Sequence, residues 1–231
     1  NVFLHKSVSI CRSKQQPQEM KIRQFEFNMF GVNTYVAWDT ATLDAVVIDP
    51  GMIDDNECRR FDSFIAERGL KLTRMLFTHL HLDHTFGSDY IASHYGLKAE
   101  GHEADGFFGE QRASQAAMFH ISREMTSLKL DRFIDEGSIA VGDDSLEVLN
   151  VPGHSPGSVA YYNRSGGWVV TGDALFKGSI GRTDLPGGNH SELVGAIREK
   201  LLTLPEETVV LPGHGPATTI AEELRSNIFI R

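Results

Sequence analysis

Short apolar segments and segments with helical spacing follow one another along most of the chain. Alternating or continuous apolar residues predict strands over residues 21–28, 33–40, 44–51, 72–78, 138–153, 157–163, 167–173 and 208–213. Apolar residues at helical spacing, with acidic residues or a cap at the start, predict helices over 54–70, 85–97, 189–207 and 218–229. Residues 102–137 have a mostly helical but irregular pattern. This order fits two sheets with helices on their outer faces, although the pattern alone also allows an ordinary α/β sheet.

The length of the chain fits a single domain. With 231 residues, of which 41% are hydrophobic, the chain can bury the core of a single domain. We expect that domain to span residues 20–231. Residues 1–19 lack an adequate apolar stretch and a small-residue cleavage site, so we interpret them as an extension outside the core rather than a signal peptide.

Charge and cysteine content exclude several classes of function. The formal net charge is -9, which disfavours nucleic acid as a partner because its binding relies on clustered Lys and Arg. No apolar run approaches 18 residues, so no membrane partner is expected. Cys11 and Cys58 form no C-x-x-C motif, and we interpret both as free thiols in a reducing, cytoplasmic compartment.

Metal-ligand side chains follow four of the predicted strands directly. The segment 73–87, TRMLFTHLHLDHTFG, carries three histidines and an aspartate where an apolar strand ends. Three later strands run into glycine-containing turns that are followed by a His or an Asp. Strand ends of packed sheets can share one edge, where binding sites commonly lie. The candidate ligands are His79, His81, Asp83, His84, His154, Asp173 and His214.

These residue types indicate a metal centre. Neutral imidazoles and carboxylates bind Zn, Fe or Mn, and five His with two Asp exceed what one tetrahedral ion needs. Two ions with a bridging carboxylate and a hydroxide between them would use the whole set. The alternative of a serine nucleophile rests on GHSPG at 153–157, which matches G-x-S-x-G. That motif requires a strand–turn–helix context, whereas Ser155 precedes a Pro and a further predicted strand.

The motifs THLHLDH, PGHSPGS, TGDALF and LPGHGP together resemble the metallo-β-lactamase superfamily. The resemblance runs from about Met20 to near the C-terminus and implies an α+β fold, an αββα sandwich of two mixed sheets. It also implies that His79, His81 and His154 hold one ion. Asp83, His84 and His214 would then hold the other, with Asp173 as the bridge and two divalent ions as cofactors, for which Zn is the favoured metal.

Within that superfamily, GDALFKGSIGRTDLPGG resembles the glyoxalase II group, closest to its short single-domain bacterial members. The resemblance implies hydrolysis of S-acyl glutathione thioesters such as S-lactoylglutathione. A metal-bound hydroxide would be the nucleophile, oriented by Asp83. Arg182 stands where that group has a basic residue for the glutathione carboxylate, although a loop salt bridge with Asp184 is the alternative.

Other activities on the same scaffold stay open at this point. Full-length glyoxalase II enzymes carry tyrosines where this chain has Asp184 and the GPATT turn, so the thiol part of the substrate is undecided. A persulfide dioxygenase, with one iron held by two His and one Asp, resembles the same motifs and is the main alternative. A nuclease and a non-catalytic binding module are less favoured. The sequence leaves the oligomeric state open.

Overall fold

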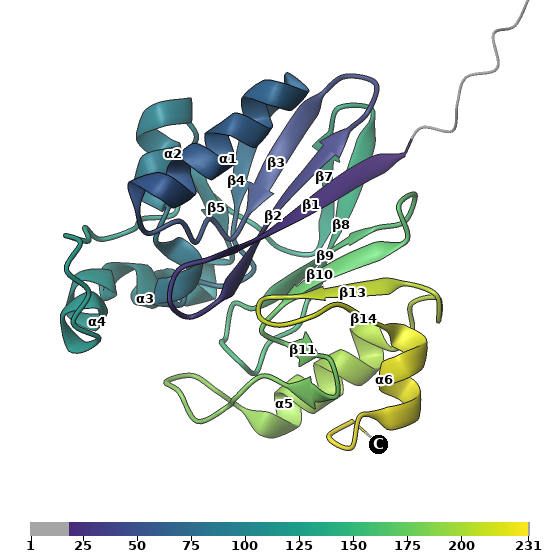
Figure 1. Cartoon of the computed structure of the whole chain (residues 1–231). Coiled ribbons are helices and arrows are strands. Elements are labelled where there is room, and N and C mark those ends of the chain that lie inside the picture. The colour runs from purple at the N-terminus through teal and green to yellow at the C-terminus, as the bar shows by residue number, and fades with distance from the viewer. Residues whose placement is uncertain (1–18, 231) are drawn as a thin grey trace, which may run out of the picture.

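Two six-stranded β-sheets face each other at the centre of the computed structural model, which describes residues 19–230 (Figure 1). In spatial order the first sheet consists of β1 (Met20–Phe27), β2 (Val32–Asp39), β3 (Asp44–Ile48), β4 (Lys71–Leu76), β5 (Ala99–Gly101) and β6 (Arg132–Phe133). The second consists of β14 (Thr218–Thr219), β13 (Val209–Pro212), β10 (Trp168–Gly172), β9 (Val159–Asn163), β8 (Asp144–Asn150) and β7 (Gly137–Val141). A small hairpin pairs β11 (Leu175–Phe176) with β12 (Ser179–Ile180).

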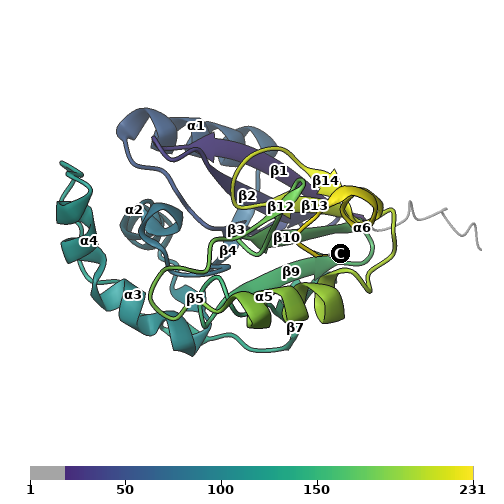
Figure 2. The ribbon, with the colours of Figure 1, turned by 90° about the horizontal axis from the view of Figure 1, so that it is seen from below.

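Helices cover the outer face of each sheet. The first sheet is covered by α1 (Asp55–Arg68) and α2 (Ser88–Tyr95). The second is covered by α5 (His190–Ala196), which continues as the π-helical turn η3 (Ile197–Leu201), and by α6 (Ile220–Ser226) (Figures 1 and 2). Two short helices, α3 (Gly106–Glu110) and α4 (Arg112–Met118), lie beyond the first sheet at the lower left of Figure 1. The predicted αββα sandwich is therefore confirmed.

The core has three apolar layers, as this architecture requires. Phe61 and Ile65 of α1 pack with Phe27 on the outer face of the first sheet. Leu193 and Ile197 pack on the outer face of the second sheet. Between the sheets lies a third layer, built from Tyr35, Val46, Ile48, Leu76, Leu146, Val148, Tyr161 and Val170. Because β3 and β10 are buried on both faces, their sequences are nearly continuous apolar runs rather than alternating ones.

The ends of α1 are where the sequence places them. The Asp54 side chain accepts hydrogen bonds from the backbone N–H groups of Asn56 and Glu57, which caps the helix N-terminus. Gly69 ends the helix in the left-handed conformation with φ of 63°. The same kind of glycine, Gly96, ends α2 with φ of 69°. Capping residues therefore fix both boundaries of α1 to within a residue or two of the prediction.

The structure differs from the predicted elements where segments are short or irregular. The helix predicted over 85–97 begins only at Ser88, because residues 82–85 form the separate 3₁₀ turn η1 (Leu82–Thr85). Residues 102–137 contain another 3₁₀ turn, η2 (Glu103–Asp105), then α3 and α4, and little regular structure before β6. The unpredicted strands β5, β6, β11, β12 and β14 have two or three residues each, too few for a detectable period.

The predicted extension, residues 1–19, lies almost wholly outside the described residues and stays a prediction, as does Cys11. Cys58 is a buried free thiol on α1, and burial raises its pKa to about 11. Across residues 19–230 the helices are too short or too polar to cross a membrane. The cytoplasmic location also stays a prediction.

Two buried tyrosines tie the sheets together near the strand ends. The Tyr161 hydroxyl on β9 donates to the backbone carbonyl of Phe77, just after β4, at 2.6 Å. The Tyr35 hydroxyl on β2 donates to the carbonyl of Pro212, at the end of β13, at 2.7 Å. Each bond therefore runs from one sheet to the last residues of a strand in the other. The Pro212 carbonyl also accepts from Nδ2 of Asn33 at 2.9 Å.

The Pro212 carbonyl has a second side-chain donor and, within residues 19–230, the Phe77 carbonyl does not, so removing the two tyrosine hydroxyls should destabilise the protein unequally. Tyr161→Phe leaves the Phe77 carbonyl without a side-chain donor among the described residues, so we expect a loss of about 1–3 kcal/mol in unfolding free energy. Tyr35→Phe should cost less, because Asn33 remains as a donor. Urea unfolding of the two variants and the wild type measures this, and equal losses would contradict it.

Candidate metal centre

All seven predicted ligand residues lie together at one edge of the sandwich. In the second sheet, β9 runs antiparallel to both β8 and β10, and β13 runs parallel to β10. The strands β8, β10 and β13 therefore end at the same edge. His154 follows β8, Asp173 follows β10, and His214 follows β13. The segment after β4 of the first sheet brings His79 and His81 to this edge, and η1 supplies Asp83 and His84.

The side chains form two groups with a shared carboxylate. Ligand atoms of His79, His81 and His154 all lie within 4.8 Å of one another, and so do those of Asp83, His84 and His214. Asp173 reaches both groups. Its Oδ2 lies 3.7 Å from Nε2 of His154 and 3.6 Å from Nε2 of His214, and its Oδ1 lies 3.4 Å from Nε2 of His84.

Hydrogen bonds on the outer side of the cluster orient most of the imidazoles. His154 Nδ1 lies 2.8 Å from the Arg182 carbonyl, and His214 Nδ1 lies 3.1 Å from the Phe30 carbonyl. His79 Nδ1 lies 3.0 Å from the Thr78 hydroxyl. An Nδ1 that donates outward leaves Nε2 as an unprotonated acceptor facing the cluster. His81 is the exception, with Nδ1 placed 2.9 Å from His154 Nε2.

Asp49 supports this arrangement and is the main residue that our sequence analysis missed. Its Oδ1 accepts from the Thr78 backbone N–H at 2.7 Å, and its Oδ2 accepts from the Thr78 hydroxyl at 2.6 Å. Oδ2 also lies 3.0 Å from Nδ1 of His84. Asp49 can also be grouped with His79 and His84 as a ligand set, but its oxygens are already engaged on the far side of the His84 ring. The only sequence signal was an acidic residue at the end of the apolar run 44–48.

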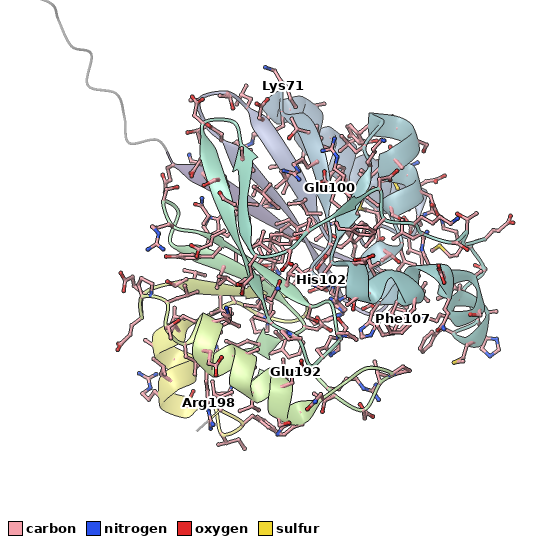
Figure 3. All side chains as sticks on the ribbon, turned by 180° about the vertical axis from the view of Figure 1, so that it is seen from behind. Lys71, Glu100, His102, Phe107, Glu192 and Arg198 are labelled. Carbon is pink, nitrogen blue, oxygen red and sulfur yellow. The ribbon has the colours of Figure 1, made fainter. Side chains whose placement is uncertain are left out.

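Asp105 joins two of the ligand-bearing loops and was also missed. This buried carboxylate accepts from the Leu80 backbone N–H at 3.1 Å and from the Gly157 backbone N–H at 2.7 Å. His102 and Phe107, labelled in Figure 3, lie on either side of it along the chain. Its Oδ2 also accepts from the Ser155 hydroxyl at 2.8 Å. Ser155 is fully buried in a turn that leads into β9, so the strand–turn–helix context of a nucleophilic serine is absent there.

The cluster keeps His79 and His81 neutral and Asp173 charged. Burial opposes protonation of His84 and His214, but the neighbouring carboxylates outweigh it and raise the pKa of both. Burial, reinforced by the neighbouring histidines, holds the pKa of His79 well below its ordinary value and lowers that of His81 to about 3. Burial opposes ionisation of Asp173, but His84, His154 and His214 outweigh it and depress the Asp173 pKa. Neutral imidazole and ionised carboxylate are the forms that bind metals.

Unpartnered atoms inside the cluster fit bound cations. Among the described residues, Nε2 of His79, Nε2 of His84 and Oδ1 of Asp173 are buried without a hydrogen-bond partner. Buried polar atoms without partners are costly, and several that converge on one volume indicate a missing common partner. A divalent cation in each group would satisfy them, because imidazole nitrogen and carboxylate oxygen are both metal donors.

A cavity of about 490 Å³ opens beside the cluster, and His81, Asp83, His154 and Asp173 line one part of it. Arg182 also lines this cavity. Its guanidinium is bound by Asp184, with Nε–Oδ1 and Nη2–Oδ2 distances of 2.7 Å each. A larger open groove of about 1100 Å³ lies over β8 and η3, but it contains none of the seven cluster residues.

Comparison with known proteins agrees with the fold. The profile described as "Metallo-beta-lactamase superfamily" matches residues 28–214. The chain belongs to this superfamily. Two curated superfamily relatives are the probable metallo-hydrolase YqgX of Bacillus subtilis and the hydroxyacylglutathione hydrolase GloC of Haemophilus influenzae. YqgX is 38% identical, over 80% of this chain and 86% of the relative; GloC is 37% identical, over 91% and 98%.

A solved superfamily structure supports the same architecture. TTHA1623, described in a di-iron-bound form, is 34% identical to this chain with a TM-score of 0.77. The match covers 90% of this chain and 99% of that one. This superfamily membership identifies the chain as a metal-dependent hydrolase in the broad sense, whereas the metal and the substrate belong to the proposal below.

Gly213 gives a direct test of how tightly the cluster is built. A Cβ at this position would lie 2.1 Å from Asp173 Oδ1 and 2.8 Å from Cε1 of His84. Gly213→Ala should therefore displace both side chains and lower the metal content of protein purified with zinc by at least half. Elemental analysis measures this content.

Gly195→Ala is the matched control, because a Cβ there on α5 meets no atom within 4 Å. It should keep full metal content and gain slightly in stability, since alanine favours the helix. Normal metal content in a folded Gly213→Ala protein would show that the cluster is looser than its geometry indicates.

Proposed function

We propose that this protein is a binuclear metal-dependent hydrolase of thioesters. The observation that carries the proposal is the pair of ligand groups joined by the Asp173 carboxylate at the edge of the cavity. No Ser, Thr, Cys, Lys or Tyr is among the described residues that line this cavity. The arrangement therefore favours attack by activated water over a covalent mechanism with a side-chain nucleophile.

The ligand assignment follows the two groups. His79, His81 and His154 would hold one ion. Asp83, His84 and His214 would hold the other, with Asp173 as the bridging carboxylate. Divalent ions in these sites would lower the pKa of water and stabilise negative charge on the substrate oxygen. Zn is the metal we favour for this donor set, while Fe or Mn also suits it. The di-iron-bound form of TTHA1623 supports iron as the alternative.

The residues of the chain itself contribute orientation and charge. Asp83 lines the cavity, and its Oδ2 lies 3.1 Å from Nε2 of His214. Burial raises the pKa of Asp83, but His84 and His214 outweigh this and lower it overall. Asp83 therefore stays an acceptor that orients water at the cluster. Asp49 holds His84 from behind and fixes its ring orientation.

A thioester is the favoured substrate because GloC, which shares 37% of its residues with this chain, is named a hydroxyacylglutathione hydrolase. S-lactoylglutathione is accordingly the first substrate to test. One experiment distinguishes thioester hydrolysis from the alternative activity, persulfide dioxygenation. Protein purified without added metal is analysed for metal content and assayed on S-lactoylglutathione and on glutathione persulfide. Two metals per chain with thioester hydrolysis support the proposal, whereas one iron with oxygen consumption on the persulfide overturns it.

Asp173→Ala tests the bridging role. Loss of a carboxylate shared by both groups should lower metal content and hydrolysis together, with a drop in kcat of at least about 10²-fold. Asp143→Ala, which removes an exposed carboxylate in the β7–β8 turn, is the control and should keep both properties. Near-normal turnover by a folded Asp173→Ala protein would refute the assignment.

Arg182 is proposed to contact a carboxylate of the thiol part of the substrate, in competition with Asp184. A charge-assisted hydrogen bond of this kind is worth about 1.5–3 kcal/mol, so Arg182→Ala should raise KM roughly 10- to 150-fold with kcat similar. Asp184→Asn, which frees the guanidinium, should lower KM for the same glutathione thioester. A neutral thioester should be unaffected by either change. Equal losses on charged and neutral thioesters would make Arg182 a structural loop residue.

A further inference from the structure

The cavity beside the cluster is largely apolar away from the metal-ligand residues. Phe30, from the turn between β1 and β2, and Phe108, from α3, both line it. Met118 at the end of α4 and the following Phe119 extend the same wall. Gln111 and Gln115 are the neutral polar side chains of the lining. An apolar cavity with a few convergent polar groups is typical of a small-molecule site.

Helix α4 presents one face to this cavity and is anchored by another. Gln111, Gln115 and Met118 are spaced by four and three residues, so they share a helix face. On the neighbouring, buried side of the helix the Arg112 side chain is 1% exposed, and its guanidinium donates to the Thr85 carbonyl, at the end of η1, at 2.9 Å. The apolar wall is thereby attached to the same turn that carries two of the cluster residues.

The outer part of the wall leaves large apolar side chains in contact with water. Phe30 is 40% exposed, Phe119 54% and Met118 74%. The Phe30 ring stacks on Phe86 and meets the Phe119 ring edge-on, with centroid distances of 6.1 and 5.8 Å. The rings are thus held in place although they are only partly buried. Exposed apolar side chains gathered at the mouth of a cavity mark a binding surface.

The charges of the lining disfavour an anionic group at the apolar wall. Arg182 is the one cation among the described lining residues, and Asp184 already occupies its guanidinium. A carboxylate placed against Phe30, Met118 and Phe119 would lose water without gaining a partner. A neutral apolar group in the same place would lose nothing and would cover exposed carbon.

We infer that the wall formed by Phe30, Phe108, Met118 and Phe119 binds the acyl group of the thioester. That acyl group is neutral, apolar and larger than lactoyl, such as hexanoyl or phenylacetyl. This inference rests on the proposed thioester hydrolysis, since the thiol part is assigned to the side of the cavity that carries Arg182. The wall thus determines which acyl groups reach the cluster.

The first test uses the metal-loaded protein and thioesters of one neutral thiol, N-acetylcysteamine, with acetyl, butanoyl, hexanoyl and phenylacetyl groups. Each methylene buried on the wall should raise kcat/KM about two- to fourfold, so hexanoyl should exceed acetyl by at least about tenfold. Phe119→Ser and Met118→Ser should each flatten this series by lowering kcat/KM for hexanoyl much more than for acetyl. Phe133→Ser is the control, because Phe133 is a similarly exposed apolar side chain (64%) on β6 that does not line the cavity.

A second measurement is independent of catalysis. Thioethers of the same thiol cannot be hydrolysed, so their binding to the zinc-loaded protein can be followed by NMR titration. S-hexyl-N-acetylcysteamine should bind at least tenfold more tightly than the S-methyl compound, and Phe119→Ser should remove most of this difference. The Phe133→Ser control should keep it.

The possible outcomes separate this inference from the proposed function. If no thioester is hydrolysed but the hexyl thioether binds as expected, the proposed reaction fails while the apolar site stands. If acetyl and hexanoyl thioesters of N-acetylcysteamine are hydrolysed equally, or S-lactoylglutathione is preferred to S-hexanoylglutathione, the inference is overturned. It is also overturned if light scattering shows a dimer that Phe119→Ser dissociates while the chain-length series is unchanged, because the wall would then be a contact between copies.

Discussion

The structure depends on the Asp173 carboxylate and the imidazoles around it. Five histidines converge at one edge of the sandwich, and three of them, His79, His84 and His154, are almost completely buried. Buried imidazoles without compensation would face one another with unsatisfied nitrogens. Asp173 provides negative charge within 3.7 Å of His84, His154 and His214. This carboxylate lies against Gly213, where any side chain would collide with it.

Much of the fold and of the cluster could be predicted because the signals are local. The apolar runs at 44–48, 168–172 and 209–212 are strands buried on both faces or nearly so, and such runs are conspicuous in a sequence. The residues after β4, β8, β10 and β13 are ligand types at strand ends, and parallel strands bring such ends to one edge. The convergence of His79 and His214, which are 135 positions apart, therefore followed from the order of strands and turns.

The remainder depends on contacts that the sequence does not encode locally. Asp49 follows β3 and Asp105 ends the turn η2, and nothing in the sequence shows which backbone N–H groups they accept from. The cavity wall is a second example. Phe30 and Phe119 are 89 positions apart, on a hairpin turn and at the end of a short helix, and only the packing of α4 against η1 brings them together. Arg182 is a third example. The sequence around it is the same whether its guanidinium binds Asp184 or a carboxylate of the substrate.

The division of the ligands between the sheets has a consequence for folding. His79, His81, Asp83 and His84 follow a strand of the first sheet, while His154, Asp173 and His214 follow strands of the second. Each ligand group draws from both, so neither sheet by itself offers a complete chelate. A cation bound by residues of both sheets would stabilise the packing of the two sheets against each other. By mass action this stabilisation would grow with the logarithm of the free cation concentration. The availability of metal in the surroundings would then govern the lifetime of the folded chain as well as its chemistry.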